Sequence, residues 1–306
     1  MLKKQSIKGS GFMKKEIVFS LLVSIIIFFP MLGNAAENKH LWKAADGVYK
    51  YNPGFGYISM FVVTDDGVVV IEPVDTKHSK GLLKAIQSVT KKPVRFLLHS
   101  HNHWDHSKGG QVFRDAGAKI IAHEKAYNWM KVNPNPELAL PDEHWSGNRK
   151  DIVLGGKTIE LHYVGVSHGL GMTVFILPEE KIAYIADIVT PNRVGFTILP
   201  DFNVKEWMRA LKEVEGLNFD KAIYAHTHAK EPMGSKLDVT KTREFLQDMQ
   251  MAIIAEFKKG TPFGEIPNTV KLPKYKHWAM YNEWLPLNVW KVMLEMHMGP
   301  FPWQPK

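Results

Sequence analysis

Apolar and polar positions recur along the chain with the spacings that are typical of strands and helices. Residues 57–73 hold two runs rich in β-branched side chains on either side of Asp65-Asp66-Gly67, a pattern that predicts a hairpin. Residues 79–89 repeat apolar side chains at helical spacing, and residues 94–98 form a short apolar run that predicts a buried strand. A second hairpin is predicted over residues 172–189.

The same two patterns continue along the chain. Further strands are predicted at 47–51, 119–123, 158–164 and 221–226, and further helices at 108–117, 124–132, 204–217 and 238–259. Residues 133–151 are rich in proline and asparagine and are predicted to be a loop. This order of elements indicates a mixed α/β protein in which helices lie outside two packed sheets.

The two ends of the chain differ from the part between them. Residues 260–306 are dense in Trp, Tyr and Met, and predict a helical extension of the main domain, which we place at 37–259. Packing on the core is the favoured role for this extension, while a pocket lid or a dimer surface are alternatives. Trp278, Tyr281 or Trp284 would then supply an apolar wall to a pocket.

Residues 1–36 resemble a secretory signal. They have a basic start, an apolar run from Ile17 to Leu32 and small residues before a predicted cleavage after Ala35 or Ala36. An uncleaved anchor helix is the alternative, but the run is shorter than the roughly 20 residues that span a bilayer and contains Pro30. We therefore expect a periplasmic or secreted protein with no stable membrane anchor after the signal is removed.

The amino-acid composition limits which ligands and which cross-links the protein can use. Residues 1–36 carry five lysines and one glutamate, so the formal charge of +8 falls to about +4 without them, which is too small to indicate nucleic acid binding. The 306 residues include no cysteine, so the fold has no disulfides. Any metal must be bound through His, Asp, Glu or water.

Residues 99–106 concentrate ionisable side chains directly behind the strand predicted at 94–98. His101 and His103 are spaced by two, so an extended backbone points both rings the same way, and Asp105 and His106 follow as the chain turns. A solvated histidine-rich loop is the alternative to a metal site. The arrangement fits two metal ions a few ångströms apart better than one.

Three downstream positions offer the missing ligands. His168 lies among glycines, Asp187 ends a predicted apolar strand, and His226 ends another, with His228 two positions on. A carboxylate at the end of a buried strand costs energy unless a cation accompanies it. Taken alone, His168 is consistent with a turn histidine and Asp187 with an ordinary turn, but together with residues 99–106 they indicate a metal centre.

This order of motifs resembles the metallo-β-lactamase superfamily over roughly residues 45–245. The resemblance implies an αβ/βα sandwich of two mixed sheets flanked by helices, with a dimetal site along one edge. It implies that His101, His103 and His168 hold the first metal and that Asp105, His106 and His226 hold the second. It also implies that Asp187 bridges the two metals. His99 lies just outside the motif and is expected to have a structural or supporting role.

Two departures from the superfamily pattern matter. The last motif commonly reads Gly-His-Gly, whereas this chain has Ala225-His226-Thr227-His228, so His226 is the predicted ligand and His228 the alternative. The branches that use a cysteine ligand are excluded because the chain has none.

The predicted activity is that of an exported hydrolase with two Zn²⁺ per chain, iron or manganese being the alternative metals. Two zinc ions that share a water lower its pKa from about 15.7 towards 7, and the resulting hydroxide would attack an acyl carbon. Asp105 is the predicted catalytic residue, because it lies where it can orient the nucleophile or carry its proton. The expected partner is a small-molecule acyl substrate, namely a β-lactam, a lactone or an ester.

Two other classes of function stay open. One is an iron-dependent sulfur oxidoreductase of the same fold, and the other is a non-catalytic metal-binding protein. The nuclease branch of the superfamily is disfavoured by the mild charge and the signal sequence. The sequence leaves the oligomeric state open.

Overall fold

A computed structural model describes Gly9 and residues 39–54, 56–228 and 233–300. The chain divides into residues 1–36 and residues 37–306. The predicted signal sequence lies, apart from Gly9, outside the described residues, so its prediction stays untested. Within the described part of the chain, no helix combines the length and apolar character needed to cross a bilayer.

The first sheet has seven strands, arranged in chain order. They are β1 (Leu41–Ala45), β2 (Val48–Tyr51), β3 (Ser59–Thr64), β4 (Gly67–Ile71), β5 (Val94–Leu98), β6 (Lys119–His123) and β7 (Glu143–Trp145). Strands β1 to β4 pair antiparallel and β4 to β7 pair parallel, so the sheet is mixed.

The second sheet has six strands and is mixed too. Its order is β13 (Gly234–Ser235), β12 (Lys221–Tyr224), β11 (Ile182–Ile185), β10 (Thr173–Leu177), β9 (Lys157–Tyr163) and β8 (Arg149–Leu154). Only β11 and β12 pair parallel.

The first sheet lies between two apolar cores, and alternate residues of its strands point into one core or the other. In β4, Val69 and Ile71 join the large core that includes the second sheet, whereas Val68 and Val70 join a smaller core under helices. Successive side chains of a strand point to opposite faces, so a strand buried on both sides is continuously apolar. The predicted sandwich of two mixed sheets with helices outside is confirmed.

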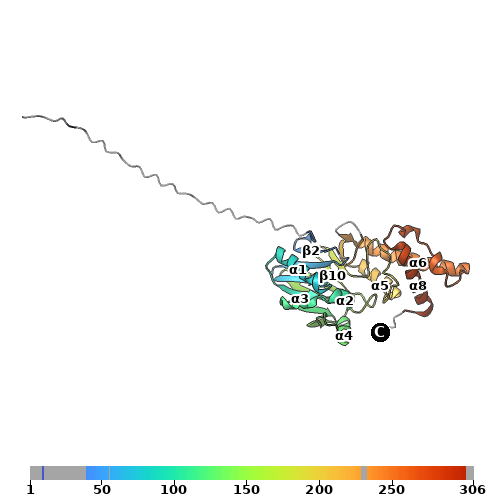
Figure 1. Cartoon of the computed structure of the whole chain (residues 1–306), viewed down its shortest axis with the longest axis horizontal. Coiled ribbons are helices and arrows are strands. Elements are labelled where there is room, and N and C mark those ends of the chain that lie inside the picture. Colours follow the sequence, from blue (N-terminus) through green and yellow to red (C-terminus); the bar gives the residue numbers. More distant parts are fainter. Residues whose placement is uncertain (1–8, 10–38, 55, 229–232, 301–306) are drawn as a thin grey trace, which may run out of the picture. The chain divides into compact units, whose positions relative to one another are not determined.

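Helices cover the sandwich on both sides. The helices near the first sheet are α1 (Thr76–Val89), α2 (Trp104–Ser107), α3 (Gly110–Asp115) and α4 (Glu124–Val132). Those beside the second sheet are α5 (Val204–Glu215), α6 (Lys236–Lys259), α7 (Ile266–Thr269) and α8 (Tyr281–Met298), with a 3₁₀ turn at Pro273–Tyr275. Figure 1 shows α1 and α3 on one side of the strands and α5, α6 and α8 on the other.

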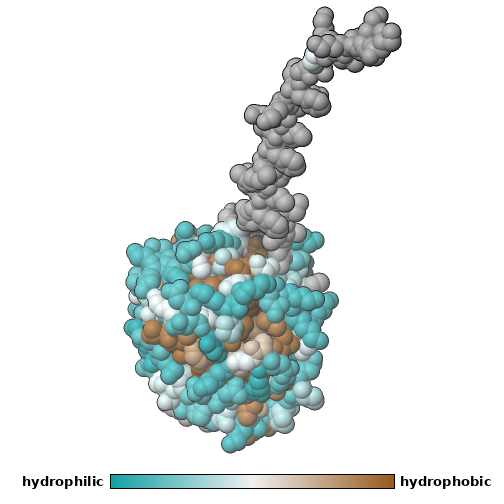
Figure 2. Space-filling view, turned by 90° about the vertical axis from the view of Figure 1, so that its left-hand side faces the viewer, coloured by the Kyte–Doolittle hydropathy of each residue, from teal (hydrophilic) through white to brown (hydrophobic). Residues whose placement is uncertain are grey.

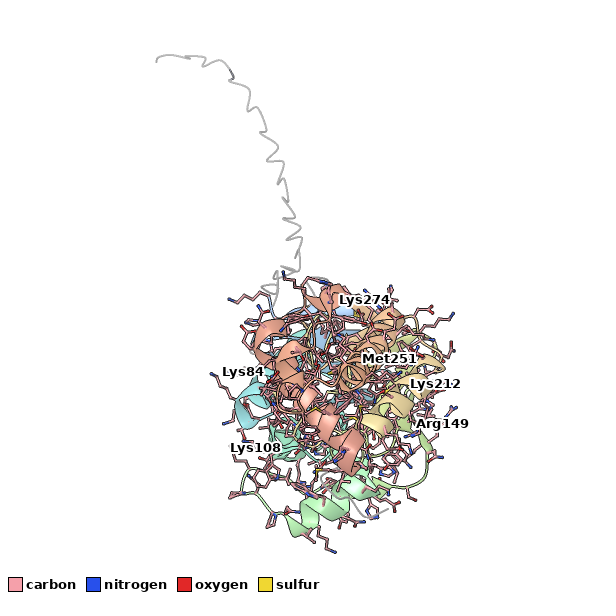
Figure 3. All side chains as sticks on the ribbon, turned by 90° about the vertical axis from the view of Figure 1, so that its right-hand side faces the viewer. Lys84, Lys108, Arg149, Lys212, Met251 and Lys274 are labelled. Atoms are coloured by element: carbon pink, nitrogen blue, oxygen red, sulfur yellow. The ribbon has the colours of Figure 1, made fainter. Side chains whose placement is uncertain are left out.

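Charged side chains lie on the surface beside several of the helices. Lys84, Lys108 and Lys274 point outward in Figure 3. The face seen in Figure 2 is mainly hydrophilic, with apolar residues gathered towards its middle.

The predicted loop over residues 133–151 is wrong in part. It contains β7 and the start of β8, which are edge strands of the two sheets. Arg149, Lys150 and Asp151 are exposed, as charged residues on sheet edges commonly are, and such residues hide the strand pattern in the sequence.

The described part of the aromatic-rich tail, residues 260–300, is largely helical and contacts the main core. Tyr275, Trp278, Leu285 and Val289 are buried in the same core as the second sheet. The boundary between domain and extension at residue 259 stays a prediction, because α6 and α8 pack on each other without a break in this core.

Candidate metal centre

Strand ends and the loops behind them bring the predicted ligands together. The chain leaves β5 into His101 and His103 and then forms α2, which carries Asp105 and His106. Asp187 follows β11, His226 follows β12, and His168 lies in the loop between β9 and β10. Asp105 aside, each of the predicted ligands belongs to a group whose ligand atoms lie within 4.8 Å of one another.

The first group holds His101, His103, His168 and Asp187. Nε2 of His101 lies 2.9 Å from Nδ1 of His103 and 3.4 Å from Oδ2 of Asp187. Nε2 of His168 lies 2.9 Å from the same carboxylate oxygen. These are the three histidines predicted for the first metal, together with the predicted bridging residue.

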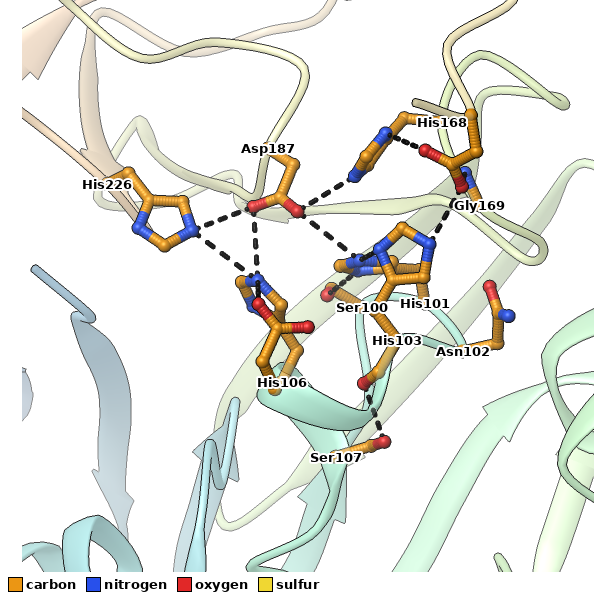
Figure 4. Close-up of polar contacts among 12 residues, drawn as sticks. Ser100, His101, Asn102, His103, His106, Ser107, His168, Gly169, Asp187 and His226 are labelled. Carbon is orange, nitrogen blue, oxygen red and sulfur yellow. Dashed lines mark hydrogen bonds and ion pairs between the residues drawn. The ribbon is translucent and has the colours of Figure 1, made fainter. Parts of the chain in front are cut away.

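The second group holds His106, Asp187 and His226. Oδ1 of Asp187 lies 3.2 Å from Nε2 of His106 and 3.0 Å from Nε2 of His226. One oxygen of Asp187 therefore faces each group, and Figure 4 shows the carboxylate between them. This geometry suits a bridging role, although the ligand assignments themselves stay predictions.

Asp105 and His228 lie at the margin of these groups. Asp105 belongs to none of them, but its Oδ2 lies 3.5 Å from Nε2 of His106 and accepts a 2.8 Å hydrogen bond from Tyr57. Its side chain is 56% exposed. Among the described residues His228 joins no group, which leaves His226 as the better placed of the two candidates.

Each inward-facing imidazole has an oxygen atom against its other ring nitrogen. The pairs are His101 with Ser100 Oγ at 2.7 Å, His103 with Asp201 at 2.7 Å, His106 with Glu72 at 3.4 Å, His168 with Asp201 at 2.7 Å and His226 with Gly56 O at 2.6 Å. Outer oxygen partners of this kind orient metal-binding histidines and fix which nitrogen is free to coordinate.

The donor set fits divalent metal ions. Imidazole nitrogens that face one another at 2.9 and 3.4 Å repel unless a proton or a cation lies between them. Oδ1 of Asp187 is buried and makes no well-directed hydrogen bond among the described residues. Nitrogen and oxygen donors without thiolate suit zinc, iron or manganese, so the residues alone do not choose the metal.

Burial and charge act in opposite directions on the pKa values of the site. Burial lowers the pKa of His101 to about 3, which keeps the ring neutral and able to coordinate. Burial also acts to lower the pKa of His168, but contacts with Asp187 and Asp201 outweigh it and raise this pKa to about 9. Burial acts to raise the pKa of Asp187, yet the charges of His106 and His226 hold it well below its usual range. The buried carboxylates are therefore ionised, and protonated imidazoles balance their charge where no metal is bound.

Three residues that support the site were not predicted from the sequence. Asp201 contacts two imidazoles and also accepts a 2.9 Å hydrogen bond from the backbone of Gly169. Glu72, fully buried, lies behind His106, and Tyr57 packs its ring against His106 and His226. Glu72 directly follows β4, so a charged residue behind an apolar strand was an available signal in the sequence. Asp201 lies in an irregular loop that offers no such signal.

His99 does not take part in the hydrogen bonding of the site. Its ring is buried, and neither ring nitrogen has a hydrogen-bond partner among the described residues. A packing role agrees with the structural role expected from the sequence.

The two groups open into a cavity of about 650 Å³. Its metal-facing wall is formed by His103, Asp105, His168, Asp187 and His226, and its other walls include Tyr57, Arg193, Phe196, Pro200 and Phe202. Of the tail residues expected to form an apolar wall, Trp278 and Tyr281 are buried in the core and do not line the cavity. Trp284 reaches it indirectly, since its ring packs 5.3 Å from that of Phe196.

Comparison with known proteins places the chain in a family. The family model of the metallo-β-lactamase superfamily matches residues 53–226. The chain belongs to the metallo-β-lactamase superfamily. The match contains every predicted ligand from His101 to His226.

One relative is a subunit of a demethylase. The alpha subunit of 2,4-dinitroanisole O-demethylase from Nocardioides sp. (strain JS1661) is 29% identical over 202 residues, which cover 64% of this chain and 58% of that protein. The chain thus spans little more than half of that relative.

Two solved structures share the fold. A metallo-β-lactamase from Pontibacter korlensis superposes with a TM-score of 0.59 at 21% identity, covering 68% of this chain and 98% of the other. The stereoselective inverting sec-alkylsulfatase Pisa1 from Pseudomonas sp. superposes with a TM-score of 0.66 at 15% identity. The superposition covers 85% of this chain and 50% of the sulfatase chain. At these identities the likeness confirms the fold alone.

Proposed function

We propose that the chain is an exported dinuclear zinc hydrolase that cleaves an acyl bond in a small molecule, such as a β-lactam, a lactone or an ester. The observation that carries the proposal is the pair of ligand groups that share Asp187 and open into one cavity. His101, His103 and His168 would hold one ion, and Asp105, His106 and His226 the other. When bound, the two ions would lower the pKa of water and polarise the acyl oxygen.

The chain's own residues supply orientation. Asp105 lines the cavity and is hydrogen-bonded to Tyr57 through Oδ2. Burial acts to raise the pKa of Asp105, but His106 and Tyr57 outweigh it and lower this pKa, so the carboxylate is ionised near neutral pH. An ionised carboxylate at this place is suited to accept a hydrogen bond from a water molecule and so to orient it. The chain needs no serine or cysteine nucleophile for this reaction.

The test is hydrolysis of a chromogenic cephalosporin by the zinc-loaded full chain, with a chelator-treated sample as control. Chelator-sensitive turnover that His103→Ala abolishes, in a variant with an unchanged circular dichroism spectrum, would support the proposal. Turnover that survives both zinc removal and this substitution would refute it. With two metals bound and no β-lactam turnover, a lactone and 4-nitrophenyl acetate test the other acyl bonds.

Export is tested separately. Expression of the full chain in a Gram-negative host should yield a periplasmic protein whose N-terminal residue is Ala36 or Glu37. Recovery of the intact N-terminus in the membrane fraction would favour the anchor alternative.

A second candidate is hydrolysis of an aryl alkyl ether. The similarity to an O-demethylase subunit favours it, and the cavity's aromatic wall of Phe196 and Phe202 suits a flat ring. Incubation with 2,4-dinitroanisole would release yellow 2,4-dinitrophenolate and methanol, with water supplying the oxygen and protons. Release of the dye without hydrolysis of any acyl substrate would favour this candidate.

The iron-dependent sulfur oxidoreductase and the non-catalytic protein remain hypotheses. Iron as the bound metal together with oxygen uptake would support the first. Two bound metals without turnover of any of these substrates would support the second.

A further inference from the structure

The two ligand groups are supported by different parts of the chain. Asp201, in the loop between β11 and α5, contacts two histidines of the first group. The histidines of the second group lie on the other side of Asp187 (Figure 4), and the residues that contact them are Gly56 and Tyr57, shortly before β3. Each group therefore has an outer support of its own.

Gly56 and Tyr57 between them contact all three predicted ligands that belong to the second metal alone. The carbonyl of Gly56 accepts a 2.6 Å hydrogen bond from Nδ1 of His226, which leaves Nε2 of that ring free to coordinate. The hydroxyl of Tyr57 donates a 2.8 Å hydrogen bond to Oδ2 of Asp105. The ring of Tyr57 packs edge-on at 5.3 Å from His106 and at 4.7 Å from His226.

These contacts are confined to one group. In the part of the chain that the structure describes, Tyr57 makes no hydrogen bond, ion pair or ring contact with the histidines of the first group, which are His101, His103 and His168. Asp201 likewise contacts His103 and His168 but none of the histidines of the second group. A change at Tyr57 should therefore act on one metal and not on the other.

Asp105 is the predicted ligand that most needs an outer partner. Its side chain is more exposed than that of any other predicted ligand, and it alone belongs to neither ligand group. An exposed side chain loses rotational freedom when a metal fixes it, and this loss reduces the affinity. The hydrogen bond from Tyr57 reduces that freedom beforehand, since the ring that carries the hydroxyl is itself held between two imidazoles.

We propose that Tyr57 is a positioning residue for the second metal. Its hydroxyl holds the carboxylate of Asp105 beside Nε2 of His106, where this metal would be bound, and so raises the affinity of the second site without affecting the first. The ring of Tyr57 keeps the hydroxyl in place by packing on the two histidines. The proposal rests on the dinuclear metal centre of the proposed function, but not on the reaction that the centre catalyses.

Stepwise zinc titration of the metal-free full chain, in competition with a chromogenic chelator, measures the two affinities. The step that Asp105→Ala weakens identifies the second site. Tyr57→Phe keeps the ring and removes the hydroxyl, so it should weaken this step by about 10-fold, the lower end of the effect of losing an outer partner, and leave the other step unchanged. Tyr49→Phe is the matched control and should change neither step, because Tyr49 stacks on Phe61 and lies outside the cavity.

Combined variants show whether Tyr57 acts through Asp105. In a chain that already carries Asp105→Ala, Tyr57→Phe should cost no further zinc affinity, because the hydrogen bond that it removes is already lost. In a chain that carries Asp201→Asn, it should still cost the full 10-fold at the second step. The same further loss in the Asp105→Ala chain would overturn the proposal, and so would equal losses at both steps or an unchanged second step in Tyr57→Phe.

Two further readings separate this proposal from a role in folding and from the proposed function. The metal-free Tyr57→Phe chain should melt at the same temperature as the metal-free wild type, and a lower Tm together with weaker binding at both steps would indicate a role in folding alone. Two bound metals with a selective loss in Tyr57→Phe, but no hydrolysis of any substrate, would leave the positioning role and refute the hydrolase. Hydrolysis together with an unchanged second affinity in Tyr57→Phe would leave the hydrolase and refute the positioning role.

Discussion

At the scale of single residues, the orientation of the imidazoles depends on acceptors that surround the metal groups. Asp201 orients more of these rings than any other acceptor named above, because its carboxylate contacts both His103 and His168. It also accepts a hydrogen bond from the backbone N–H of Gly169. Burial acts to raise the pKa of Asp201, but hydrogen bonds with the two histidines hold it far below its usual range. An ionised acceptor on two rings makes both better metal ligands.

We therefore expect Asp201→Asn to weaken metal binding at the first group by about 10- to 100-fold, the usual effect of losing an outer partner of a metal ligand. Competition with a chromogenic chelator measures this affinity. Asp142→Asn is the matched control, because Asp142 also accepts a backbone N–H, from Ile120, but lies outside the cavity. Equal metal affinity in Asp201→Asn and wild type would show that Asp201 has no part in the site.

His99 gives a prediction about pH. Burial, and then the charge of Arg114, lower the pKa of the folded-state ring to about 3. As pH falls below about 6.5, the unfolded chain gains a proton at His99 that the folded chain does not gain until about pH 3. The neutral buried ring thus contributes stability above pH 6.5, and this contribution is lost between pH 6.5 and about 3.

Replacing His99 by leucine removes that proton uptake. The free energy of unfolding of His99→Leu relative to wild type should rise by about 1.4 kcal/mol for each pH unit below about 6. Urea unfolding of the metal-free proteins at several pH values between 8 and 4 measures the difference, with His144→Leu at an exposed position as control. A difference that does not depend on pH would contradict this account of His99.

At the scale of elements, helix α8 connects the tail to the cavity. Nδ2 of Asn288, in this helix, donates hydrogen bonds of 3.0 and 2.6 Å to two carbonyls of the loop between β11 and α5. Glu295 of the same helix accepts a 2.8 Å hydrogen bond from the backbone of Val204, at the start of α5. The loop between β11 and α5 is thus held in its middle and at its C-terminal end by one helix, and this loop carries Arg193 and Asp201.

Asn288→Ala should lower the free energy of unfolding by about 2 kcal/mol, because two carbonyls of a partly buried loop lose the donor that the buried Asn288 side chain supplies. It should also raise KM more than it lowers kcat, since the loop shapes the cavity without touching the predicted nucleophile. Denaturant unfolding and steady-state kinetics measure the two effects. Asn282→Ala, at an exposed position of the same helix, should change neither. An unchanged KM in Asn288→Ala would mean that the loop keeps its shape without the tail.

The same elements explain what the sequence could and could not predict. Residues 99–106 were informative because all their ligands lie within one strand end and one turn, where spacing alone decides which way side chains point. Asp187 and His226 could be predicted because each follows an apolar strand, and parallel strands such as β11 and β12 end at the same edge. Asp201 could not, because contacts with α8, some 90 residues away, set the path of its loop.

At the scale of the whole molecule, the two groups of predicted metal ligands combine residues from both sheets. His101, His103 and His106 follow the first sheet's β5, whereas His168, Asp187 and His226 follow strands of the second. A metal that binds both sets would link the two layers of the sandwich. Without it, ionised Asp187 and Asp201 would lie in a buried site with only histidine charge to balance them.

Metal removal should therefore destabilise the whole fold and not the loops alone. A ligand at 1,000 times its Kd stabilises the folded state by about 4 kcal/mol, which for a protein of this size corresponds to a Tm shift of roughly 10 °C. Calorimetry of the full chain with zinc and with a chelator measures this shift. His101→Ala is the control, because it removes a predicted ligand of the first group and should make Tm much less sensitive to the chelator. If the wild-type chain melts at the same temperature with and without metal, the two sheets are held by their apolar core alone, and the metal groups serve chemistry without stabilising the sandwich.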